Sequence, residues 1–144
     1  MKITLKRISD CIVGIVCLAA VFLCAGCGTK KEPVQKIKDL DFTVIAEENI
    51  PEEFLVKIQE KKADGMKMTY QDAGFLYICI GYGKQESGGF SIAVNEVYET
   101  TNALYFDTTL LGPKPGENPP GKDSPSFPFV VVKTEFIDKP VVFE

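Results

Sequence analysis

Hydrophobic and polar residues alternate along most of the chain after residue 40. The alternation predicts two strands that precede and follow a helix, at 41–47 and 66–70, and further strands at 75–82, 90–98, 103–111 and 129–136, with a brief last pairing at 141–143. Residues 75–82 are apolar on both faces, which is typical of a central strand. Segments 90–98 and 103–111 predict a hairpin with the inward set Phe90, Ile92, Val94, Leu104, Phe106 and Leu110.

The spacing changes to a helical period between residues 51 and 65. Pro51 suits a first helical turn, Glu52 and Glu53 suit the positive end of a helix dipole, and Phe54 and Ile58 share one face. The sequence therefore predicts an α+β fold. We expect a mostly antiparallel sheet of about five or six strands with one short amphipathic helix packed on it.

The N-terminal part has a different pattern. Lys2, Lys6 and Arg7 precede an uncharged apolar run of sixteen residues, Cys11 to Gly26. This run is shorter than the roughly 17 to 25 residues that span a bilayer as a helix, so it fits a signal peptide better than an anchor. Because the positive charges precede the run, they remain inside and the rest of the chain is exported.

The end of this run, Leu23-Cys24-Ala25-Gly26-Cys27, resembles the lipobox of bacterial lipoproteins. The resemblance implies cleavage before Cys27 and attachment of diacylglycerol to its thiol, with fatty chains such as palmitate holding the protein on the outer face of the cytoplasmic membrane. Cys24 departs from the motif, which usually has an aliphatic residue there. The alternative is an uncleaved N-terminal helix that reaches Thr29, and it exports residues 28–144 as well.

The predicted organisation is a signal peptide at 1–26, a charged tether at 27–40 and one domain at 41–144. Three of the five cysteines lie in the apolar run and Cys27 is the lipid site, so only Cys79 remains for the domain. Its apolar surroundings in sequence indicate a core residue rather than a nucleophile.

Composition excludes several function classes. The chain has no histidine, which rules out histidine-based catalytic triads and histidine-liganded zinc. After removal of the signal peptide 13 basic and 19 acidic residues remain, a balance that disfavours nucleic acid as a partner. We predict no catalytic residue, no metal and no cofactor.

Two connections stand out between the predicted strands. Residues 81–89 contain four glycines and predict a hairpin turn or bulge with positive φ at Gly88 and Gly89, because the spacing does not match a phosphate-binding loop. Residues 112–128 contain six of the nine prolines. A long irregular connection of this kind in a small domain is either a binding loop or a mobile insertion without a role.

The segment from Gly83 to Ile92, followed by a hairpin, a proline-rich loop and the run Ser126-Phe127-Pro128-Phe129, resembles the C-terminal domain of the PrcB family. Ser87 and Phe90 stand where that family usually has threonine and tyrosine. The resemblance covers about residues 75–136. It implies a non-catalytic accessory lipoprotein that binds and supports a surface, subtilisin-like protease.

Three hypotheses follow for the function. The first is a membrane-anchored accessory or scaffold subunit that binds an extracytoplasmic protein through loops and sheet edges. The second is a loop-based protease inhibitor, and the third is a histidine-free hydrolase that uses Ser87 or Ser91 with Lys84. The candidate partner-binding residues are Lys84, Ser87, Gly88, Gly89, Phe90, Pro113, Pro115, Pro119 and Pro120.

Overall fold

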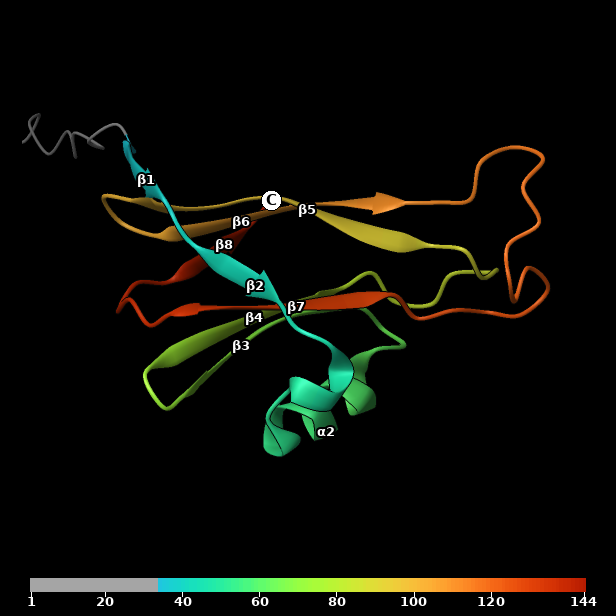
Figure 1. Ribbon diagram of the computed structural model, residues 1–144, viewed down its shortest axis with the longest axis horizontal. Helices are drawn as coiled ribbons and strands as arrows, with labels where there is room; N and C mark the ends of the chain where they lie inside the picture. The colour runs from blue at the N-terminus through green and yellow to red at the C-terminus, as the bar shows by residue number, and fades with distance from the viewer. Residues whose placement is uncertain (1–33) are drawn as a thin grey trace, which may run out of the picture. The chain divides into compact units, whose positions relative to one another are not determined.

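The computed structural model describes residues 34–144, which form two four-stranded sheets and one α-helix (Figure 1). The predicted signal peptide and Cys27 lie outside the described residues. The elements are β1 (Lys36–Asp39), β2 (Phe42–Val44), the 3-10 helix η2 (Glu47–Asn49), α2 (Glu52–Lys61), β3 (Met66–Asp72), β4 (Phe75–Gly81), β5 (Ser91–Thr100), β6 (Leu104–Leu111), β7 (Phe129–Glu135) and β8 (Val141–Phe143).

The strands divide between two sheets that stack face to face (Figure 1). The first sheet has the order β1-β5-β6-β8 and the second has the order β2-β7-β4-β3. Their inner faces enclose one hydrophobic core, whose buried members are Leu40, Leu76, Ile78, Ile80, Val97, Leu104, Phe106 and Val132. Alternate residues of β4 and β7 therefore point into the sandwich, as the period of two requires.

Helix α2 covers the outer face of the second sheet (Figure 1). Phe54 and Ile58 on the helix are buried against Tyr77, Cys79 and Val131 on the strands. The helix begins after Pro51, and Glu52 and Glu53 occupy its first turn, as the sequence predicts. The predicted α+β class is confirmed, and so is the position of β4 between β7 and β3.

The number and grouping of strands differ from the expectation of five or six in one sheet. The described residues contain eight strands in two sheets, and β1 lies within the segment 27–40 that the sequence assigns to a tether. The Leu40 N–H donates to the Val97 carbonyl oxygen at 2.8 Å, so the chain crosses between the sheets at a buried residue. The sequence KIKD does not show the hydrophobic alternation of a strand, because β1 lies at the edge of its sheet with all four residues exposed.

The hairpin β5–β6 is confirmed, but its inward set changes partway along. The register shifts between Val94 and Glu96, and this bulge places Val97 on the core face after Val94. Of the predicted inward set, Leu104 and Phe106 are buried in the core and Ile92 and Val94 pack against it, whereas Phe90 and Leu110 are not part of this core cluster. The last strand, β8, pairs with β6 in parallel, whereas the other strand pairs are antiparallel. Among residues 34–144, no helix is long and apolar enough to cross a membrane.

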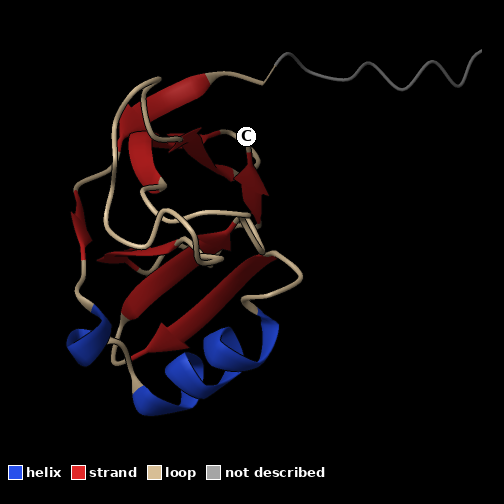
Figure 2. Cartoon of the chain, turned by 90° about the vertical axis from the view of Figure 1, so that its right-hand side faces the viewer, coloured by secondary structure: helices blue, strands red, loops and turns tan. Residues whose placement is uncertain are grey.

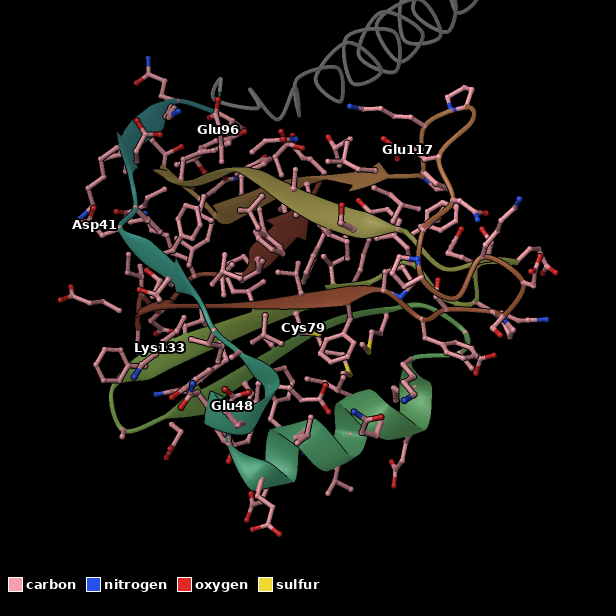
Figure 3. All side chains as sticks on the ribbon, turned by 45° about the vertical axis from the view of Figure 1, so that its right-hand side comes forward. Asp41, Glu48, Cys79, Glu96, Glu117 and Lys133 are labelled. Carbon is pink, nitrogen blue, oxygen red and sulfur yellow. The ribbon has the colours of Figure 1, made fainter. Side chains whose placement is uncertain are left out.

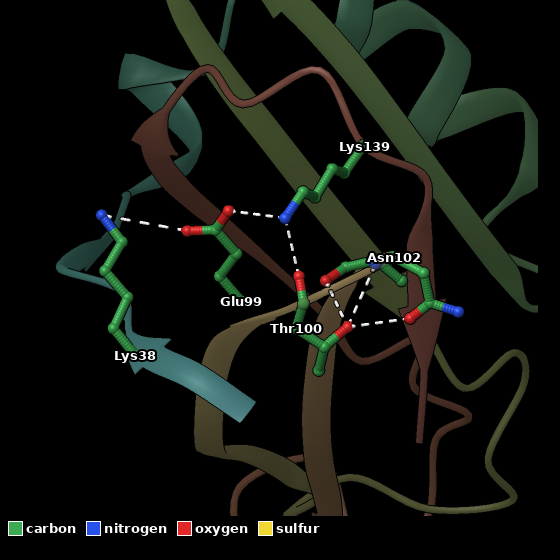
Figure 4. Close-up of polar contacts among 6 residues, drawn as sticks. Lys38, Glu99, Thr100, Asn102 and Lys139 are labelled. Atoms are coloured by element: carbon green, nitrogen blue, oxygen red, sulfur yellow. Dashed lines mark hydrogen bonds and ion pairs between the residues drawn. The ribbon is translucent and has the colours of Figure 1, made fainter. Parts of the chain in front are cut away.

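Two ion pairs join β5 to β1 and to the segment before β8, and both involve Glu99 (Figure 4). Lys139 Nζ lies 2.7 Å from Glu99 Oε1 and donates to the Thr100 carbonyl oxygen, also at 2.7 Å. Lys38 on β1 approaches the other oxygen of Glu99 at 3.9 Å. The hydrogen bond from Lys139 lowers the pKa of Glu99 below its ordinary value, because it favours the charged carboxylate.

Candidate functional site

The two connections that stand out in the sequence lie together at one end of the sandwich. The glycine loop, residues 82–90, joins β4 to β5, and the proline loop, residues 112–128, joins β6 to β7. Figure 2 views the molecule from this end and shows both loops in front of the sheets. We call the joined loops the paired-loop surface.

The glycine loop is not the hairpin turn that the sequence predicts. It links strands of different sheets, since β4 belongs to the second sheet and β5 to the first. The sequence could not reveal this, because strand alternation is the same whether the next strand pairs beside the last one or crosses to the other layer.

Main-chain hydrogen bonds join the two loops. Gln85 and Ser126 form an isolated antiparallel bridge, with N–H to O distances of 2.8 Å and 3.0 Å. The Gly88 N–H donates to the Gly121 carbonyl oxygen at 2.8 Å, and the Ser126 hydroxyl donates to the Ser87 carbonyl oxygen at 2.7 Å. The proline loop is therefore tied to the glycine loop along its second half.

Glycine is needed at both paired positions, but for different reasons. A Cβ on Gly88 would lie 2.4 Å from the Pro120 carbonyl oxygen, so the backbones approach more closely than a side chain permits. Gly89 has φ of 85°, and a Cβ there would lie 2.6 Å from the Pro119 ring. The predicted positive φ is thus confirmed at Gly89 and wrong at Gly88, where close packing takes its place.

The glycine loop is also fixed to the rest of the domain. The Lys84 N–H donates to the Ala63 carbonyl oxygen at 3.0 Å, which ties the loop to the turn after α2. At the start of the loop, the Tyr82 hydroxyl lies 2.9 Å from Thr108 Oγ1 on β6. The glycine loop is thus hydrogen-bonded both to the turn after α2 and to β6 of the first sheet, in addition to its contacts with the proline loop.

Most of the predicted partner-binding residues meet at the contact between the loops. Pro113 and Pro119 face Gly89, and Pro120 faces Gly88. The Phe90 ring lies over Gly112, where an added Cβ would be 3.1 Å from its Cε1 atom. The exceptions are Lys84, whose side chain is 52% exposed and pairs with Glu86, and Pro115, which lies exposed at the outer part of the loop.

The candidate residues chosen from the sequence omit two that join the loops, Gln85 and Ser126. Gln85 and Ser126 form the bridge itself, and Gln85 Nε2 also donates to the Tyr82 carbonyl oxygen at 3.0 Å. Ser126 lies in the motif that carries the family resemblance, so its position before Phe127 was the available signal. Its role depends on a contact 39 residues away in sequence, which no local pattern encodes.

The arrangement offers little to covalent chemistry. The Lys84 ammonium is exposed beside Glu86, whereas a lysine general base needs burial to lower its pKa. Cys79 lies on β4 between the sheet and α2 (Figure 3), and burial raises the pKa of its thiol to about 12, which keeps it protonated. Within residues 34–144, no group of cysteine and carboxylate side chains is arranged to hold a metal ion.

A comparison with protein families finds a match that contains the paired-loop surface. No curated protein and no solved structure matches the chain. The family model described as PrcB C-terminal matches residues 76–135. This interval begins in β4, ends in β7 and contains both loops. The segment from β4 to β7 therefore matches the PrcB C-terminal family model, as the resemblance in the sequence predicts.

Proposed function

We propose that the protein is an extracytoplasmic lipoprotein that acts as a non-catalytic accessory subunit of a surface protease complex. The observation that carries the proposal is the paired-loop surface, in which two long loops are tied together by main-chain hydrogen bonds and rest on a β-sandwich. Loops that are ordered before binding lose less conformational entropy when they meet a partner. The match to the PrcB C-terminal family indicates which class of partner to examine first.

The anchoring half of the proposal rests on the sequence. The apolar run ends in Ala25 and Gly26 and is followed by Cys27, which gives the small residues and the thiol that lipoprotein processing requires. The described domain begins close to this site, with β1 starting at Lys36. At roughly 3.3 to 3.6 Å per residue, the eight residues between Cys27 and β1 span at most about 30 Å, so an anchored domain would stay near the membrane.

Whether the captured protease is active distinguishes an accessory role from inhibition. The full-length chain with a C-terminal affinity tag is recovered from detergent-solubilised envelopes of its own cells, and protease activity in the eluate is measured with a general peptide substrate. We expect a protease to co-elute with its activity intact, because an accessory subunit leaves the active site open. Recovery of a blocked protease would favour the inhibitor hypothesis, and recovery of no protease would contradict both.

Lipid attachment has a direct test of its own. Replacing Cys27→Ala removes the thiol that would receive diacylglycerol, so we expect the unprocessed precursor to accumulate. The intact mass of the protein, measured for the wild type and for C27A, checks this. The variant Cys24→Ala is the control, because it keeps Cys27, and it should mature normally. A wild-type chain with an unmodified Cys27 would contradict the proposal.

A further inference from the structure

One side of β7 is only partly covered by a neighbouring strand. Strand β4 pairs with β7 along its whole length, from Phe129 to Glu135. On the other side β2 pairs only with residues 132–134, and the ladder ends where the Ile45 N–H donates to the Val131 carbonyl oxygen at 3.0 Å. The chain then turns away into η2, so β2 does not continue beside the first residues of β7.

Strand geometry shows where the main-chain groups of Phe129 point. The N–H and C=O of a strand residue point to the same side, and this side alternates from one residue to the next. Val131 directs its carbonyl to β2, whereas the Pro128 carbonyl accepts from the Tyr82 N–H on the side of β4. Phe129 therefore directs both of its main-chain groups to the side of β2, beyond the last bond of the ladder.

A cavity of about 380 Å³ lies at this place. Its walls include the side chains of Val44, Ile45, Ile50 and Phe127, with Glu47 as the charged member. Residues 128–131, which include Phe129, complete its lining. The cavity thus combines apolar walls and one carboxylate with a main-chain donor and acceptor pair that no strand of residues 34–144 shares.

The cavity adjoins the paired-loop surface along the chain. Phe127, which lines the cavity, directly follows Ser126, and Ser126 forms the bridge to Gln85 that joins the two loops. A partner that rests on the loops could therefore extend one segment into the cavity without leaving the surface of the domain.

We propose that the edge of β7 at Phe129 receives an extended segment of the protein partner, which adds to the second sheet in line with β2. Main-chain bonds to Phe129 supply the pairing, as in other strand-addition complexes. The apolar walls suit a branched aliphatic side chain, and Glu47 suits a lysine or arginine next to it. This inference rests on the proposed function and names the edge and the peptide chemistry through which the partner binds.

The test compares amide hydrogen exchange at Phe129 in the free full-length chain and in the complex captured through its C-terminal tag. We expect exchange at Phe129 to slow at least tenfold in the complex, because the amide gains a hydrogen-bond acceptor. A complex in which Phe129 exchanges as fast as in the free chain would overturn the inference and leave the proposed function standing. Recovery of no complex would overturn both.

Two matched variants check the cavity itself. Val44 lines the cavity and Val56 lies on α2, and both residues are 53% exposed. We expect V44K to recover at least tenfold less partner than the wild type, because the lysine fills the cavity, and we expect V56K to recover an unchanged amount. Thermal unfolding of both variants confirms that the domain is folded. Equal recovery by V44K and V56K would also overturn the inference.

Discussion

At the scale of single residues, the absence of a side chain matters as much as its presence. Gly88 allows its backbone to approach Pro120, and Gly89 adopts a left-handed conformation beneath the Pro119 ring. The sequence predicts that the paired glycines are needed, since glycine is the residue for tight turns. It could not distinguish a φ requirement from a packing requirement, because the second depends on a loop about 30 residues further along the chain.

The pairing of Glu99 with Lys139 gives a prediction of pH dependence. The pKa of Glu99 is lowered in the folded state from its ordinary value of 4.5, chiefly by the hydrogen bond from Lys139. The stabilisation is therefore complete above the unfolded-state pKa and is lost as the pH falls through the folded-state pKa. We expect Glu99→Gln to lower the free energy of unfolding at pH 7, and the difference from the wild type to shrink below about pH 4.5.

Urea unfolding of the wild type and E99Q between pH 7 and pH 3 measures this difference. Glu96→Gln is the control, because Glu96 is 53% exposed where it pairs with Lys36, and exposed pairs contribute little. A gap between the wild type and E99Q that widens on acidification would contradict the assignment.

At the scale of elements, the sequence predicts best what is local. Helix α2 and the hairpin β5–β6 follow from spacing within a short window, and both are confirmed. The exposed edge strand β1 and the crossing from β4 to β5 depend on which strands become neighbours, which hydrophobic alternation does not encode. The sequence singled out the two loops one by one, but only the fold shows that they are joined.

The contact between the loops is tested by two glycines with the same positive φ. Gly89 and Gly116 both have φ of 85°, but an added Cβ would meet Pro119 at 2.6 Å at the first position and no atom within 4 Å at the second. Both alanine variants carry similar backbone strain, so their difference isolates the contact. We expect G89A to open the loops more easily than G116A.

Amide exchange at Gly88 reports the opening, because its N–H donates to Gly121 across the contact. We expect exchange in G89A to be about tenfold faster than in G116A, which corresponds to about 1.4 kcal/mol. Equal exchange rates in the two variants would mean that the loops do not depend on this packing.

At the scale of the whole domain, residues 34–144, the strands of the sandwich place the β3–β4 turn, with Gly74, and the paired-loop surface at opposite ends (Figure 1). The chain enters the domain beside the hairpin turn of β5 and β6, since Lys36 is opposite Thr100 in the register. The paired loops lie at the other end of the same hairpin, so the first described strand pairs with β5 at the end away from the candidate binding surface.

The most direct test of partner binding at the paired-loop surface is the amount of protease captured by G89A and by Gly74→Ala. Gly74 also has positive φ, of 81°, and an added Cβ there meets no atom within 4 Å, so G74A adds similar strain far from the loops. We predict that G89A recovers at least tenfold less protease than the wild type, and that G74A recovers as much as the wild type. Equal recovery by the two variants would contradict the claim.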